Sequence, residues 1–219
     1  MAYLLDRYRD ATRLAVRAGF DAIEIHAAHG YLLHSFLSPI SNTRDDAYGG
    51  DLAGRMRFPL QVVSAVRDVW PAERPLLFRM SSIDGAGVGW SLDDSVALAG
   101  RLRAFGVDVV DCSSGGMNLP SVSSLVARVP GFQVPFAREI RARSGIATMA
   151  VGLIRTPEQA NAIIADGDAD LVALAREHLW NPNWAGQAAV DLGADPEWKS
   201  WPRPFGWWLR RRARRSSGS

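Results

Sequence analysis

The sequence predicts an α/β fold with a parallel sheet, and specifically an incomplete (β/α)8 TIM barrel in which about five of the eight strands are present. Three observations lead to this prediction. Short apolar segments alternate with amphipathic helical segments, and polar residues follow the carboxyl end of each apolar segment. No G-x-G-x-x-G motif follows the first apolar segment, as it would in an open dinucleotide-binding sheet.

The first half of the chain supplies three helix and strand pairs. Apolar residues at helical spacing predict a helix over Tyr3–Ala18, which Gly19 ends. Ser91 is an expected N-cap, since two aspartates follow it in the first turn of a helix that runs to Phe105. The remaining elements expected here are a strand over Phe20–Ile25, a helix over Arg55–Trp70, and strands over Leu76–Met80 and Val107–Cys112.

The second half continues the alternation. Thr156 followed by Pro157 is a typical helix start, and we expect that helix over Glu158–Asp166. The other expected elements are a helix over Phe136–Arg143, strands over Ile146–Ala150 and Asp170–Leu174, and a last helix over Asn181–Leu192. Because strands that alternate with helices are joined by right-handed crossovers, the sheet should be parallel.

Composition indicates an ordinary globular protein of the cytoplasm. The chain has 219 residues, of which 47% are hydrophobic and 22% charged, which excludes disorder and a disulfide-stapled miniprotein. Cys112 has no partner for an internal disulfide, which favours a reducing compartment. The sequence has no apolar run of about 20 residues, so we expect no membrane span, and we expect no nucleic-acid partner.

The sequence divides into a predicted barrel portion, residues 1–198, and a basic aromatic tail, residues 199–219. The tail holds seven basic and no acidic residues. Its end, Arg210–Ser219, is interpreted as a solvated, fraying terminus, with contact to RNA or a membrane surface as the alternative. Its aromatic part, Trp201–Arg210, could pack against its own barrel or form an interface with a second copy.

Two imidazoles and a phenol follow the first strand. His26 and His29 are three residues apart, so on one helical turn they would face the same side and could donate two hydrogen bonds to one oxygen. Tyr31 could supply a proton from a group that is neutral at pH 7. The alternatives are partly buried structural side chains or a metal site, for which a third ligand is not evident, and we assign no metal.

A phosphate site is expected in the loops after the last two strands, where barrels commonly bind phosphate. Val151-Gly152 follows one strand and Ala175-Arg176 the other. Gly152 permits close backbone approach to a phosphate, although it could be only a turn glycine, and Arg176 can donate charge-assisted hydrogen bonds.

At Ala18–Leu33 and Phe36-Leu37-Ser38-Pro39 the sequence resembles the old yellow enzyme family of FMN-dependent NAD(P)H oxidoreductases. The resemblance continues through Asn42–Gly50, Arg55–Phe58, Phe78–Ser81, Asp111–Gly116, Val151–Ile154 and Ala173–Glu177. These motifs occur in order over nearly the whole chain. The paired histidines are similar to those of the bacterial subgroup.

The resemblance implies a flavin enzyme of the ene-reductase type. Residues matching His26 and His29 hydrogen-bond the carbonyl or nitro oxygen of an activated alkene, the residue matching Tyr31 donates the proton, and reduced FMN, recharged by NAD(P)H, delivers hydride. Arg79 matches a residue that faces the flavin N1 and C2 carbonyl. The cofactor-binding residues implied are His26, Arg79, Ser113, Val151, Gly152, Ala175 and Arg176.

The family's first three strands have no match, so the sequence resembles the C-terminal five-eighths of such an enzyme. An unclosed barrel would expose two strand edges and one face of its core. We therefore expect the isolated chain to bind FMN weakly or not at all. The alternative to an FMN-dependent NAD(P)H oxidoreductase is a truncated, non-catalytic remnant or a half-barrel that needs a partner chain.

Overall fold

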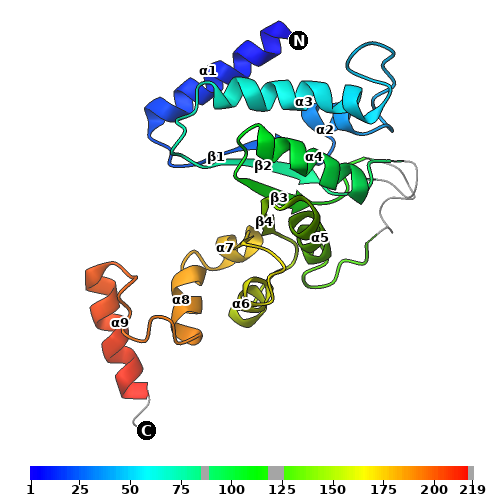
Figure 1. The fold of residues 1–219 in the computed structure, drawn as a ribbon. Coiled ribbons are helices and arrows are strands. Elements are labelled where there is room, and N and C mark those ends of the chain that lie inside the picture. Colours follow the sequence, from blue (N-terminus) through cyan, green and yellow to red (C-terminus); the bar gives the residue numbers. More distant parts are fainter. Residues whose placement is uncertain (85–88, 118–125, 217–219) are drawn as a thin grey trace.

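A computed structural model describes residues 1–84, 89–117 and 126–216 (Figure 1). Its sheet has five parallel strands whose spatial order equals their order in the sequence. They are β1 (Ile23–Ala27), β2 (Leu76–Ser81), β3 (Val109–Ser113), β4 (Ala147–Ala150) and β5 (Leu171–Val172). A doubly wound sheet reverses its strand order at a switch point, whereas a barrel does not. The strand order is therefore that of a five-strand segment of a (β/α)8 barrel, which confirms the predicted fold class.

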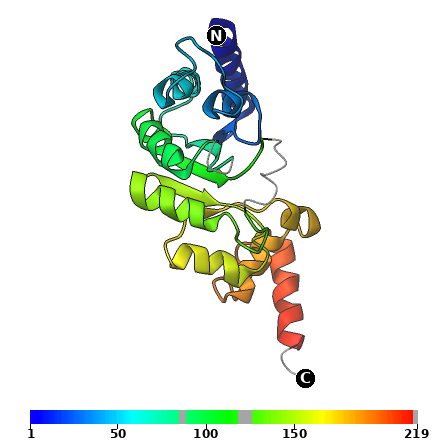
Figure 2. The same cartoon turned by 90° about the vertical axis from the view of Figure 1, so that its right-hand side faces the viewer.

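Helices connect successive strands and cover one face of the sheet (Figures 1 and 2). The helices are α1 (Ala2–Ala18), α2 (Leu32–Leu37), α3 (Leu52–Arg67), α4 (Leu92–Ala104), α5 (Val134–Ser144), α6 (Pro157–Ala165), α7 (Arg176–Trp180), α8 (Trp184–Asp191) and α9 (Arg203–Ser216). Helix α1 packs on α3, α3 on α4, and α4 on α5, as neighbours in the outer ring of a barrel do.

Strand alternation separates an apolar face from a polar one. The hydrophobic core lies between the sheet and the helices, where Phe78, Met80 and Val110 are fully buried. The intervening residues, among them Arg79 and Asp111, point to the opposite face, which is the inside of the barrel segment. Charged side chains at those positions leave this inner face suited to binding rather than to packing.

The first strand begins and ends later than predicted. Helix α1 ends with Gly19 in the left-handed conformation, and the N–H of Phe20 donates to the carbonyl oxygen of Ala15 at 3.2 Å. Because this cap uses the backbone of Phe20, the strand starts only at Ile23. His26 consequently lies within β1 and not after it.

The predicted helix over Asn181–Leu192 is wrong in its first part. Asn181 is extended, with φ −131° and ψ 94°, so α7 ends before it and α8 begins only at Trp184. The reason is Pro182, which disfavours the helical conformation in the residue before it.

The tail is helical where a fraying terminus was predicted. Helix α9 runs over Arg203–Ser216, and its Gly206 lies against the carbonyl oxygen of Trp198, closely enough that a side chain at 206 would not fit. Residues 217–219 lie outside the described part of the chain. Within the described ranges, no helix has the length and apolar character needed to cross a membrane.

We predict that Ser91→Ala lowers the free energy of unfolding by about 1 kcal/mol. Ser91 and Asp94 form a reciprocal capping box at the start of α4, with hydrogen bonds of 3.0 and 3.1 Å. Ser64→Ala, within α3, is the matched control, because the Ser64 side chain makes no hydrogen bond among the described residues. Urea denaturation measures both, and equal losses would contradict the capping role.

Candidate active site

The inner face carries a row of polar side chains at the same level of three neighbouring strands. His26 on β1 pairs in register with Arg79 on β2, and Arg79 pairs with Asp111 on β3. The guanidinium of Arg79 donates from Nε to Ser113 Oγ at 3.0 Å and forms an ion pair with Asp111 Oδ2 at 3.2 Å. The parallel register therefore fixes a cation beside the first imidazole.

Two carboxyl groups adjust the charge around Arg79. Burial raises the pKa of Asp111 to about 6, although the nearby guanidinium of Arg79 opposes the shift. Burial and the charge of Asp111 raise the pKa of Glu24 on β1 to about 7, again against the effect of Arg79. The second oxygen of Asp111, Oδ1, is buried and has no hydrogen-bond partner among the described residues. The cation is thus held by one carboxylate whose other oxygen is not satisfied by the described residues.

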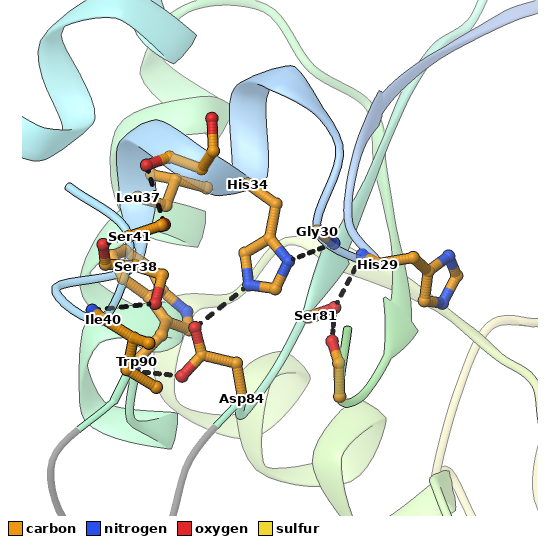
Figure 3. Close-up of polar contacts among 12 residues, drawn as sticks. His29, Gly30, His34, Leu37, Ser38, Ile40, Ser41, Ser81, Asp84 and Trp90 are labelled. Atoms are coloured by element: carbon orange, nitrogen blue, oxygen red, sulfur yellow. Dashed lines mark hydrogen bonds and ion pairs between the residues drawn. The ribbon is translucent and has the colours of Figure 1, made fainter. Parts of the chain in front are cut away.

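A tight turn after β1 carries the second imidazole. His29 and Gly30 are both left-handed, with φ of 60° and 80°. The N–H of His29 donates to Ser81 Oγ at 3.1 Å, and the N–H of Gly30 donates to His34 Nδ1 at 2.8 Å (Figure 3). A side chain at Gly30 would collide with the carbonyl oxygen of Gly116, so only glycine fits there.

The turn brings the predicted catalytic side chains together, but not as a helical turn. The ring of His26 lies 5.4 Å from that of His29 and 5.2 Å from that of Tyr31, measured between centroids, both in edge-on arrangements. The expectation that the two histidines share one helical face is wrong, because His26 is in a strand and His29 is in the left-handed turn. Tyr31 is the N-cap residue of α2 and is 66% exposed.

Both imidazoles are neutral at pH 7. Burial and then the charge of Arg79 lower the pKa of His26, and the same two causes lower the pKa of His29 to about 4. The N–H of Ala28 donates to His26 Nδ1 at 3.2 Å, so the single proton of the His26 ring is on Nε2. Neutral imidazoles in this setting can each donate one hydrogen bond to a substrate oxygen.

A cavity of about 510 Å3 opens at the carboxyl ends of the strands, which is within the range of roughly 300–1,000 Å3 typical of ligand sites. Seven of the predicted site residues line it, whereas His26 lies beside the lining residue His29, and Tyr31 lies beside His26. The seven are His29, Arg79, Ser113, Val151, Gly152, Ala175 and Arg176.

The far end of this cavity has features that suit an anion. Gly152 has φ 122°, and a Cβ there would lie 2.9 Å from the ring of Phe132. The next residue, Leu153, is also left-handed, and the backbone N–H groups of both residues donate no hydrogen bond within the described chain. Arg176 forms no ion pair among the described residues. Successive free N–H groups and a guanidinium fit a phosphate.

Sequence reasoning missed four polar residues that support the site. Gln133 accepts from Ser114 Oγ at 2.8 Å and donates to the carbonyl of Val151 at 3.1 Å, which ties the loops after β3 and β4. Ser81, His34 and Asp84 support the turn after β1. Strand alternation could have found Ser81, since it lies two residues after Arg79 on the same face. Among the residues whose positions are described, no cluster of three His, Cys, Asp or Glu could hold a metal ion.

Comparisons with known proteins identify relatives along most of the chain. The sequence profile of the NADH:flavin oxidoreductase / NADH oxidase family matches residues 2–194. The chain is 47% identical to an NADPH dehydrogenase of Geobacillus sp. (strain WCH70) over 189 residues, 86% of this chain and 54% of that protein. An NADPH dehydrogenase of Listeria innocua is 47% identical over 186 residues, 85% of this chain and 53% of that protein. The chain thus spans about half the length of these relatives.

Solved structures agree on the fold. Morphinone reductase in complex with tetrahydroNAD superposes with a TM-score of 0.70 at 28% identity, over 87% of this chain and 49% of that one. A 2-naphthoyl-CoA reductase superposes with a TM-score of 0.77 at 22% identity, over 90% of this chain and 30% of that one, which concerns the fold alone. The profile match and the identity to the NADPH dehydrogenases agree with the ordered motifs and the barrel topology. The chain therefore belongs to the NADH:flavin oxidoreductase / NADH oxidase family, the old yellow enzyme family.

Proposed function

We propose that the chain carries the FMN and acceptor site of an NAD(P)H-dependent oxidoreductase of the ene-reductase type, which reduces a small electrophilic alkene. The observation that carries the proposal is the grouping of His26, His29 and Tyr31 beside Arg79, at the margin of a cavity whose other end suits a phosphate. When bound, FMN supplies a two-electron carrier between NAD(P)H and the acceptor.

The residues at the cavity fit FMN from end to end. Gly152 and Arg176, with the neighbouring Val151 and Ala175, would hold the phosphate, because the N–H groups and the guanidinium there have no partner among the residues that the structure describes. Arg79 and Ser113, with His26, would hold the ring end of the cofactor. A guanidinium such as that of Arg79 favours an anionic partner.

The two histidines would bind the acceptor and the tyrosine would complete the reaction. Neutral His26 and His29 each donate one N–H to the same carbonyl or nitro oxygen, which stabilises negative charge as it develops there. Reducing an activated C=C bond requires one proton in addition to the hydride, and Tyr31 Oη–H supplies it. Because Tyr31 is 66% exposed, solvent can return the proton to it.

A half-barrel that needs a second polypeptide is the alternative. It is favoured by the exposure of Leu171, which is 46% exposed on β5 at one edge of the sheet. The tail supplies a second candidate contact, since Phe205 and Trp208 on α9 are 61% and 65% exposed and Arg211 stacks on the Trp207 ring at 4.7 Å. We propose this aromatic and basic surface as a contact with a second copy of the chain.

FMN should bind the purified chain with a dissociation constant above about 1 µM, a binding free energy weaker than about −8 kcal/mol. Binding is weakened because the sheet ends in two open edges, β1 and β5. Quenching of flavin fluorescence measures it. Arg176→Ala should raise the dissociation constant about tenfold by removing charge-assisted hydrogen bonds.

Arg143→Ala is the matched control for Arg176→Ala in the FMN-binding measurement, because Arg143 on α5 pairs with Asp93 and does not line the cavity. No quenching at about 1 mM FMN, or an equal effect of both substitutions, would contradict the flavin site. Binding tighter than about 1 µM would contradict the weakening by open edges.

Tyr31→Phe should slow NADPH-dependent alkene reduction by a factor of about 100 or more at saturating FMN, because a positioned proton donor is lost. Consumption of NADPH with a quinone acceptor, which needs no carbon protonation, should change little. Tyr3→Phe, on the exposed surface of α1, is the control. Equal rates of alkene reduction by the wild-type chain and by Tyr31→Phe would exclude Tyr31 as the proton donor. An absence of any flavin-dependent turnover would favour the non-catalytic alternative.

A further inference from the structure

A buried histidine and aspartate lie directly behind the turn that carries His29. His34 on α2 is 1% exposed and Asp84, after β2, is fully buried. Their side chains meet at 3.1 Å between Nε2 and Oδ2. On its other side, the His34 ring accepts a hydrogen bond from the N–H of Gly30 at 2.8 Å. Figure 3 shows this chain of contacts, with the His29 ring on the far side of the turn from His34.

These contacts determine which nitrogen of His34 carries the proton. The backbone N–H of Gly30 can only donate, so Nδ1 must present a lone pair to it. The proton is therefore on Nε2, from which it is donated to the Asp84 carboxylate. A His34 ring with its proton on Nδ1 would place two donors against each other and lose the bond to Gly30.

Asp84 is itself held in place by a hydrogen bond to its other carboxylate oxygen, Oδ1. The N–H of Trp90 donates to Asp84 Oδ1 at 2.5 Å, and the indole of Trp90 donates to Ser95 Oγ at 2.6 Å. Trp90 and Ser95 are themselves fully buried. The carboxylate thus accepts from a side chain on one oxygen and from the backbone on the other, and an amide in its place could accept on one side only.

The turn needs such support because its backbone is unfavourable. A left-handed conformation is costly for a residue with a side chain and persists only where surrounding contacts over-determine it. His29 has φ 60°, and the N–H groups of His29 and Gly30 are held by Ser81 and His34. Without the His34 contact, the N–H of Gly30 has no hydrogen-bond partner among the described residues.

We propose that His34 and Asp84 are a positioning pair for the acceptor site: Asp84 fixes the Nε2–H tautomer of His34, and this tautomer holds the Gly30 backbone so that the His29 ring stays in the cavity. Neither side chain lines the cavity, so neither is a catalytic residue. The use of the held ring in binding an acceptor oxygen rests on the proposed function. The positioning itself does not, since it can be measured without flavin.

The decisive variant is Asp84→Asn, which keeps the size of the side chain. The carbonyl oxygen of an amide can still accept from the N–H of Trp90, which leaves the NH2 group facing His34 Nε2. We expect His34 to move its proton to Nδ1 and release Gly30. Long-range 15N–1H NMR spectra of the histidine rings, recorded on the full chain without flavin, distinguish the two tautomers.

A second readout follows the displaced ring. The pKa of His29 is held at about 4 by burial, then by the charge of Arg79. When the turn is released, burial of the ring decreases, and the pKa of His29 should rise toward its ordinary value of about 6.5. A pH titration of the histidine ring protons measures this in the wild type and in the variant.

Ser95→Ala is the matched control, because it removes the bond to the Trp90 indole in the same buried cluster but leaves Asp84 and His34 intact. It should destabilise the chain without changing the tautomer of His34 or the pKa of His29. A wild-type His34 with its proton on Nδ1 would overturn the proposal even if no variant folded. So would an Asp84→Asn chain whose His34 tautomer and His29 pKa are unchanged, or a Ser95→Ala chain that changes both.

Discussion

The reversal of the backbone at His29 and Gly30 is the constraint on which the site depends. It occurs where the chain leaves β1, within contact distance of the backbone at Gly116, and it is the reason that three polar rings from one short segment meet. On a helical turn at this place, the second imidazole would lie on the same helix face as the first. The left-handed turn instead directs it into the cavity, beside Arg79.

The register of the parallel strands places the charged residues of the site next to the first histidine. Parallel strands with consecutive order put His26, Arg79 and Asp111 at one level on the inner face. Burial, and then the cation at that level, lower the pKa of both histidines. The guanidinium that we propose to face the flavin would thus, together with burial, also disfavour charge on the two imidazoles that we propose to bind the acceptor.

The fold class and most of the cavity could be predicted from the sequence, because alternating apolar periods and polar strand ends are local signals. The pairing of Arg79 with Asp111 could not, since it depends on register between strands far apart in the chain. Errors arose where backbone geometry overrides periodicity, as at Pro182, whose effect on the residue before it delays the start of the last predicted helix to Trp184. The support of the turn by His34 was missed because a lone histidine in an apolar segment carries no directional signal.

A crystal structure of the chain soaked with FMN would test the central claim, which is that one cavity accommodates the cofactor and the acceptor side by side. The account predicts the phosphate at the Gly152 and Arg176 end of the cavity, and the ring system beside Arg79 within reach of His26 and His29. Flavin bound on another face, or a metal ion held between the two imidazoles, would contradict it.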